Sequence, residues 1–73
     1  MIAGYSDRAR PLTPRMVDVL AAGARGLTVI QTAGELAVTE STVCSIRAAA
    51  IARLGVPNFT AAVAVFVRGD VKR

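Results

Sequence analysis

The sequence predicts an all-α protein of four helices, and three observations support this prediction. Each of four segments follows a threonine that can cap the start of a helix. Within these segments the apolar residues recur at helical spacing, which places them on one face of a helix. No alternating apolar and polar run bounded by turn residues predicts a sheet. Because the links are short, we expect one compact domain.

The first helix is expected from residue 14 to about residue 23 or 24. Thr13 can cap it, and Pro14 suits the first helical position because a proline lacks the N–H that would be unpaired there. Gly23 and Gly26 mark its end. Its expected apolar face consists of Met16, Val19 and Leu20, with Leu12 packing at its entry.

The second helix is expected to begin with a capping box and to end near residue 35 or 36. The Thr28 hydroxyl can accept a backbone N–H, and the Gln31 side chain can bond back to Thr28. Ala33 and Leu36 face inward, and Thr32 shares their face as a weaker core residue.

The third helix is expected over residues 40–54, and the fourth over residues 61–68. Thr39 caps the third helix, Gly55 ends it, and Thr60 caps the fourth. The expected core residues of these two helices are Val43, Ile46, Ala50, Leu54, Ala62, Val63 and Phe66.

Length and composition limit how such a chain can be stabilised. With 73 residues it lies near the lower size limit for an independent core, and many of its apolar residues are alanines that bury little area. One cysteine and no histidine exclude an internal disulfide and argue against a zinc site. Helix packing or dimerisation must then stabilise the fold, and the lone cysteine fits a reducing cytoplasm.

Charge is unevenly divided along the chain. Residues 1–40 carry four basic and four acidic side chains, so the net charge of +4 comes from residues 41–73. A basic half favours a polyanionic partner, although such a charge also serves ordinary solubility. We expect a flexible tail over 1–10, a helical domain over 11–69 and a basic tail over 70–73.

Several functional classes find no support. No apolar run is long enough to span a membrane, and the charged N-terminus lacks the apolar region of a signal peptide. No histidine–cysteine pairing, carboxylate cluster or glycine-rich phosphate loop predicts catalysis. We therefore expect no enzyme, no cofactor and no metal.

The second and third helices, joined by about three residues, have the plan of a helix-turn-helix. Their surroundings carry a longer pattern: Leu12-Thr13-Pro14-Arg15, Val19-Leu20, Gly26-Leu27-Thr28, Ala33, Leu36, Val38-Thr39-Glu40, Thr42-Val43, Leu54-Gly55-Val56, Asn58 and Thr60-Ala61-Ala62-Val63. This pattern resembles, without a gap, the LuxR/GerE-type helix-turn-helix DNA-binding domain in its stand-alone form. The resemblance implies a four-helix fold and a bacterial or phage regulator of transcription whose third helix enters the major groove.

The sequence departs from that family's usual pattern at several positions. Met16 stands where a glutamate is usual, so the first helix loses its capping-box partner. Thr32 and Ala50 stand where bulky aliphatic residues are usual, so the core is smaller. Cys44 replaces a basic residue, and Ile46 replaces a histidine.

By the resemblance, the base-reading positions are Cys44, Ser45 and Ala48. Ser45 can make one hydrogen bond and Ala48 can touch a thymine methyl, whereas strong readout uses long polar side chains. The small side chains predict modest specificity, an unusually close approach to the DNA, or another use such as binding a protein. In the plainer interpretation, Cys44 is inert and the alanines merely favour a helix.

More residues of this sequence are suited to phosphate contacts than to base contacts. Free N–H groups at the starts of the second and third helices favour an anion, and arginines add positive charge. The candidates are Thr28, Gln31, Thr39, Ser41, Thr42, Arg47 and Arg53. Alternatively, the threonines are plain caps and Arg53 is only a cation at a helix end.

The resemblance also implies dimerisation through the fourth helix, at Ala61, Val65 and Arg68. A second apolar face would otherwise be exposed there, unless Ile2 and Tyr5 of the N-terminal tail cover it. We therefore expect a regulator that binds double-stranded DNA as a homodimer. The alternative is a protein-interaction module on the same fold, an antagonist of RNA polymerase or another transcription factor, with weak or no DNA binding.

Overall fold

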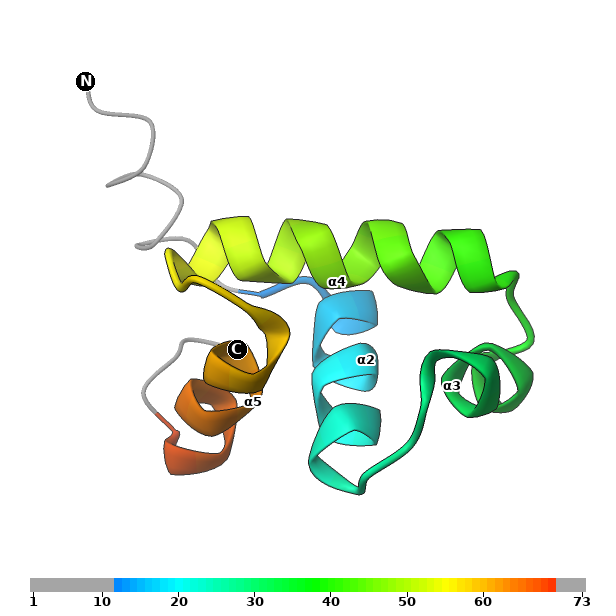
Figure 1. Cartoon of the computed structure of the whole chain (residues 1–73), viewed down its shortest axis with the longest axis horizontal. Helices are drawn as coiled ribbons and strands as arrows, with labels where there is room; N and C mark the ends of the chain where they lie inside the picture. Colours follow the sequence, from blue (N-terminus) through cyan, green and yellow to red (C-terminus); the bar gives the residue numbers. More distant parts are fainter. Residues whose placement is uncertain (1–11, 70–73) are drawn as a thin grey trace.

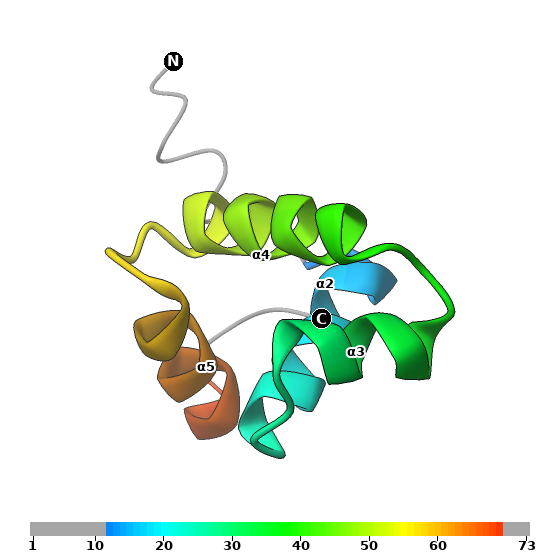
Figure 2. The ribbon, with the colours of Figure 1, turned by 45° about the vertical axis from the view of Figure 1, so that its right-hand side comes forward.

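A computed structural model of the chain describes residues 12–69, and this part contains four helices and no strand. Helix α2 spans Pro14–Ala24, α3 Val29–Leu36, α4 Glu40–Leu54 and α5 Phe59–Arg68. In Figures 1 and 2, α4 lies along one side of the other three helices. The all-α, four-helix prediction is confirmed, whereas the predicted tails at 1–10 and 70–73 lie outside the described residues.

Helix α2 begins as the sequence predicts. The Thr13 hydroxyl accepts the backbone N–H of Met16 at 3.2 Å, and Pro14 is the first helical residue. Met16 has no carboxylate with which to bond back to Thr13, so the cap is one-sided. Its side chain is instead buried in the core, which gives this helix start a tertiary contact.

Helices α3 and α4 also begin and end near the predicted residues. In α3 the Gln31 N–H donates to the Thr28 hydroxyl at 3.1 Å, and the Thr28 N–H donates to the Gln31 side chain at 2.9 Å. Thr39 caps α4 by accepting the N–H of Thr42 at 3.1 Å. Ala37, with φ 58°, ends α3 in the left-handed conformation, so the link to α4 is tight although no glycine occurs there.

The predicted cap of α5 is wrong. Asn58, not Thr60, caps this helix, because its side-chain oxygen accepts the N–H of Ala61 at 2.8 Å. The helix therefore begins at Phe59, two residues earlier than expected. Both residues are good caps by type. With Asn58 as the cap, Phe59 is the first residue of the helix, and the Phe59 ring packs against Gly23 of α2.

The core lies where α2 meets the other helices. Leu20, Val19 and Val43 are the largest fully buried side chains. Four alanines are also buried, and so is Thr32, the weaker core residue of the prediction. The predicted core residues Leu36, Ile46, Val63 and Phe66 are half-buried instead. The small interior is therefore closed by helices that approach one another closely.

The close approach of α5 to α2 depends on a glycine. A Cβ atom placed on Gly23 would lie 2.6 Å from Cε2 of Phe59 and 3.0 Å from Cγ2 of Val63. Both distances are shorter than ordinary van der Waals contact. Any larger residue at this position must displace the Phe59 ring or the whole of α5.

No single described helix is long and apolar enough to cross a membrane. Helices α4 and α5 together reach the length and composition of a span, but they are bent by 63° at the break between them.

We expect Asn58→Ala to lower the free energy of unfolding by about 1 kcal/mol, because it removes the acceptor for a helix-terminal N–H. Thr60→Ala is the matched control, and we expect it to change stability by less than about 0.5 kcal/mol. Urea unfolding followed by circular dichroism measures both. A larger loss in Thr60→Ala than in Asn58→Ala would contradict the cap assignment.

We expect Gly23→Ala to lower the free energy of unfolding by about 1 kcal/mol, since overpacking costs roughly 1–3 kcal/mol and the gain in helix propensity offsets only part of it. Gly34→Ala is the control within a helix, because a Cβ there meets no atom within 4 Å. We expect this control to raise stability by about 0.5–1 kcal/mol. Urea unfolding tests whether the two substitutions change the free energy of unfolding in opposite directions. If both Gly23→Ala and Gly34→Ala stabilised the protein, the proposed steric constraint at Gly23 would be ruled out.

Candidate nucleic-acid interface

Helices α3 and α4, with the three-residue link 37–39, form the helix-turn-helix pair. Helix α4 is the longer one, and its two sides differ in burial. Val43, Ala50 and Leu54 are buried on the inner side. The predicted base-reading residues Cys44, Ser45 and Ala48 are all exposed on the outer side, as are Ser41, Ala49 and Ala52. Within the described protomer, no helix covers this outer side.

The predicted phosphate ligands at the helix starts act as caps in this structure. Thr28 and Gln31 are joined in the capping box, and the hydroxyl oxygens of Thr39 and Thr42 lie 2.8 Å apart. All four side chains are exposed. A threonine hydroxyl that accepts a backbone N–H can still donate its own O–H, although one of the Thr39 and Thr42 hydroxyls donates to the other. The capping role is therefore compatible with an anion at the same position.

Arg47 is held in place by an aromatic ring. Its guanidinium carbon lies 4.1 Å from the centre of the Phe59 ring, and the side chain is half-buried. Arg47 and Phe59 line a groove of about 480 Å³ together with Thr28 and Thr60. This stacking limits the reach of the guanidinium, but it also keeps a positive charge beside the start of α3.

The predicted phosphate ligands divide between the two flanks of α4. At about 100° per residue, Cys44 and Arg47 lie on the flank that faces the start of α3 and α5. Thr42 and Arg53 lie on the opposite flank, where Arg53 is half-buried in the last turn of α4. Between the flanks lies the strip with Ser45 and Ala48, which consists of small side chains.

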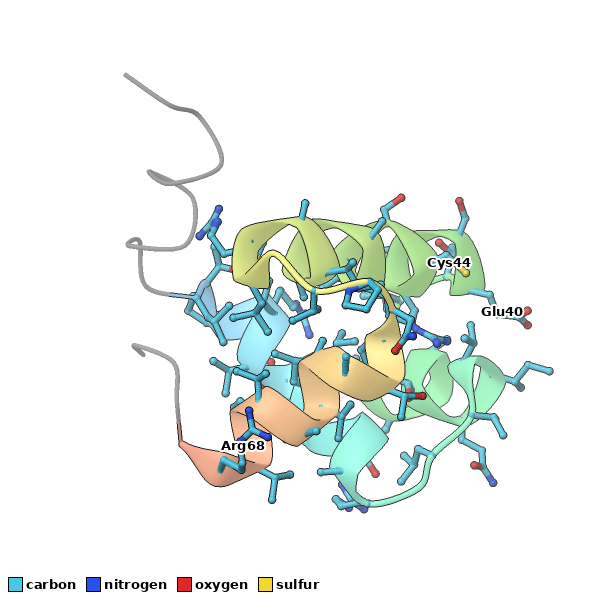
Figure 3. The ribbon with its side chains drawn as sticks, turned by 60° about the vertical axis from the view of Figure 1, so that its left-hand side comes forward. Glu40, Cys44 and Arg68 are labelled. Carbon is cyan, nitrogen blue, oxygen red and sulfur yellow. The ribbon has the colours of Figure 1, made fainter. Side chains whose placement is uncertain are left out.

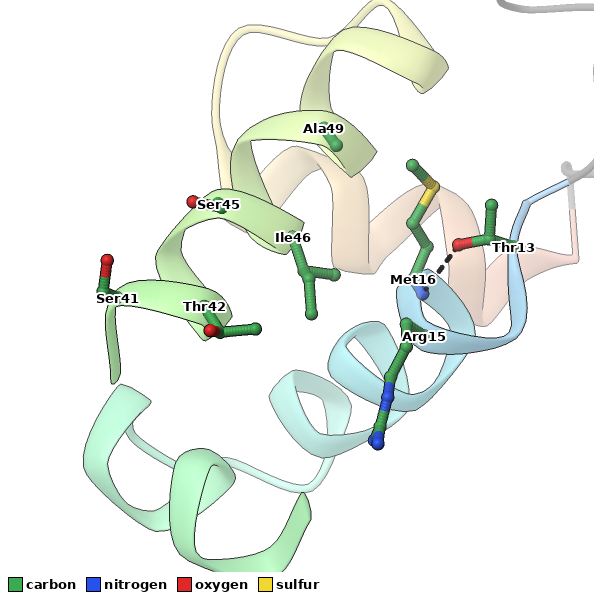
Figure 4. Close-up of a pocket in the computed structure, with 8 residues that line it drawn as sticks. All are labelled: Thr13, Arg15, Met16, Ser41, Thr42, Ser45, Ile46 and Ala49. Carbon is green, nitrogen blue, oxygen red and sulfur yellow. Dashed lines mark hydrogen bonds between the residues drawn. The ribbon is translucent and has the colours of Figure 1, made fainter. Parts of the chain in front are cut away.

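A second groove, of about 290 Å³, runs along the Thr42 flank between α4 and the first turn of α2 (Figure 4). It is lined from the α4 side by Ser41, Thr42, Ser45, Ile46 and Ala49, and from the α2 side by Thr13, Arg15 and Met16. Arg15 is not among the site residues predicted from the sequence. Nothing in the spacing along the chain indicates that α2 starts beside α4, because that contact is made only in the folded protein.

Charges near the outer side of α4 are mixed. Glu40 and Cys44 project from the first turns of α4, whereas Arg68 projects from the end of α5 (Figure 3). Glu40 is exposed and favours the positive end of the helix dipole, but it would repel a nearby phosphate. Arg25 is bound to Glu35 at 2.6 Å, and this ion pair joins the C-terminal ends of α2 and α3. Of these charges, Glu40 belongs to the first turn of α4, beside the predicted phosphate ligands Thr39 and Ser41.

The predicted dimer residues on α5 differ in their surroundings. Arg68 is exposed, but Ala61 and Val65 are half-buried, and Val65 packs against the core cluster. Helix α5 contacts both α2 and α4, so its buried face is wider than the sequence predicts. The large apolar side chain that α5 exposes is Val67, at 65% of its surface. The described residues contain no cluster of acidic, cysteine or histidine side chains that could hold a metal ion.

Comparison with known proteins identifies a family. The model of the GerE domain, described as bacterial regulatory proteins of the luxR family, matches residues 10–66, which is most of the chain. No curated protein and no solved structure matches the chain significantly.

Proposed function

This chain belongs to the luxR family of bacterial regulatory proteins, and from that premise we propose that it regulates transcription by binding double-stranded DNA with α4 in the major groove. The observation that carries the proposal is the outer side of α4, where Ser45 and Ala48 are exposed. A major groove about 12 Å wide admits one helix, and α3 would brace it against the backbone.

Affinity in this proposal comes mainly from phosphate contacts. Thr28 and Arg47 lie on one flank of α4, and Thr42 and Arg53 on the other. A helix in the major groove has a phosphate backbone on each side, so groups on both flanks are placed to bind. Because each neutralised phosphate releases counterions, binding should weaken steeply as salt rises.

In this proposal, small side chains make the contacts to the DNA bases. Ser45 offers one donor and acceptor, and Ala48 offers a methyl group that suits the methyl of thymine. Cys44, at the edge of this strip, is exposed and adds a weak thiol donor. Small residues let the helix backbone approach the floor of the groove closely, so the proposed specificity is modest and depends on shape.

Dimerisation through α5 would add specificity. The exposed Val67 and Ala64 leave an apolar strip on this helix, with Arg68 beside it. A two-fold dimer would present two copies of α4 to half-sites about one helical turn apart. Ala61 and Val65 would contribute at the edge of such a contact.

The small outer side of α4 would also suit a protein partner, and the exposed Ile30 of α3 adds an apolar side chain to the surface of the helix-turn-helix pair. This alternative, a module that binds a transcription factor or RNA polymerase, predicts weak or absent DNA binding. Direct titration with DNA distinguishes the two functions.

We expect mixed-sequence duplex DNA to bind the chain at low salt, with a loss of affinity of about tenfold or more between about 50 and about 200 mM salt. Fluorescence anisotropy measures the affinity at each salt concentration.

The single cysteine, Cys44, tests which surface binds the DNA. Bound DNA should slow the reaction of its thiol with N-ethylmaleimide.

A variant that combines Cys44→Ser with Arg25→Cys is the control, because α2 ends on the side of the fold away from α4. Its thiol should react at the same rate with and without DNA. Absence of binding even at low salt would favour the protein-interaction module. Protection of the control thiol as strongly as Cys44 would contradict the proposed surface.

We expect Ala48→Lys to change base preference by about tenfold at one or two base pairs, because a long cationic side chain would then reach base edges. Ala24→Lys, an exposed alanine at the end of α2, adds the same charge without that reach. Selection of bound sequences from random DNA at fixed salt compares the variants. Unchanged preference in Ala48→Lys would refute the placement of the reading side, and single, unpaired sites would refute the dimer.

A further inference from the structure

We propose that the groove between α4 and the first turn of α2 receives a DNA sugar–phosphate strand, and that Arg15 is its principal cation. This inference rests on the proposed function and extends the DNA contact surface to α2. The groove is lined by residues of both helices and has a volume of about 290 Å³ (Figure 4).

The chemistry of the groove matches such a strand. Its deeper side chains, Met16 and Ile46, are apolar and at least half-buried. Its exposed rim carries the Arg15 guanidinium and several hydroxyl groups, including those of Thr42 and Ser45. A sugar–phosphate strand combines apolar deoxyribose with anionic phosphate, so it can satisfy both kinds of surface at once.

The position of the groove supports the same occupant. On the other flank of α4, Arg47 and Thr28 line a groove of about 480 Å³. Of α4, Arg47 lines that groove, and Arg47 lies on the opposite flank of this helix from Thr42. Backbones lie on both sides of a helix in the major groove, and Arg15 is placed to bind the one that Arg47 does not reach.

Arg15 is available for this contact. Its side chain is 51% exposed, and its guanidinium lies 3.8 Å from the carboxylate of Asp18, which is itself about half exposed. Such an exposed ion pair contributes little to stability, so the guanidinium can turn toward a phosphate without loss of the fold. A charge-assisted bond to phosphate would be the stronger interaction.

The test is the salt dependence of DNA binding by Arg15→Gln. Removal of one phosphate contact should reduce the log–log salt slope by about one unit, so the variant should lose about threefold less affinity than the natural chain from about 50 to about 200 mM salt. Arg15→Lys should restore the slope. Arg25→Gln removes the same charge from the far end of α2, where Arg25 is bound to Glu35, and should leave the slope unchanged.

The outcomes separate this inference from the proposed function. If the natural chain binds DNA and Arg15→Gln keeps its slope, or changes no more than Arg25→Gln, the groove has another occupant and the inference fails alone. If the natural chain does not bind DNA at low salt, the inference and the proposed function fail together. Circular dichroism of the three variants at the assay temperature verifies that they are folded.

Discussion

The packing of α2 against the three other described helices is the constraint on which the rest of this structure depends. Leu20 and Val19 of this helix are fully buried, and Gly23 leaves the space into which the Phe59 ring packs. A chain this short buries little apolar surface, so the few buried side chains of the described residues must position α4. The orientation of α4, and therefore of its exposed side, follows from its packing against α2 together with its contacts to α3 and α5.

That constraint also accounts for the two grooves beside α4. The first turn of α2 lies against one flank, and the Phe59 ring lies against the other with Arg47 stacked upon it. The residues between these flanks have small side chains that project little from α4. A partner can therefore approach the backbone of this helix closely. The protein has polar and cationic groups on both flanks of a strip whose side chains are all small, which favours recognition of a backbone over recognition of individual bases.

The alanine-rich interior limits the stability of a single chain and would give dimerisation a stabilising role. Ala50 and Ala62 are fully buried, and they let the helices approach closely while contributing little apolar area. A core of this kind gives a defined shape with a small margin of stability. The exposed Val67 on α5 provides surface that a second subunit could bury, which would add the apolar contact that a single chain lacks.

The sequence by itself determined the helices and the exposed side of α4. The caps at Thr13, Thr28 and Thr39 are hydrogen bonds between residues three apart, and helical periodicity separates Val43 from Ser45, so both can be predicted without the fold. The tertiary structure alone decided the packing of Phe59 against Gly23, the partial burial of Val65 and the place of Arg15 beside α4. Each of these depends on which residues of distant segments meet, and no local pattern in the chain records such contacts.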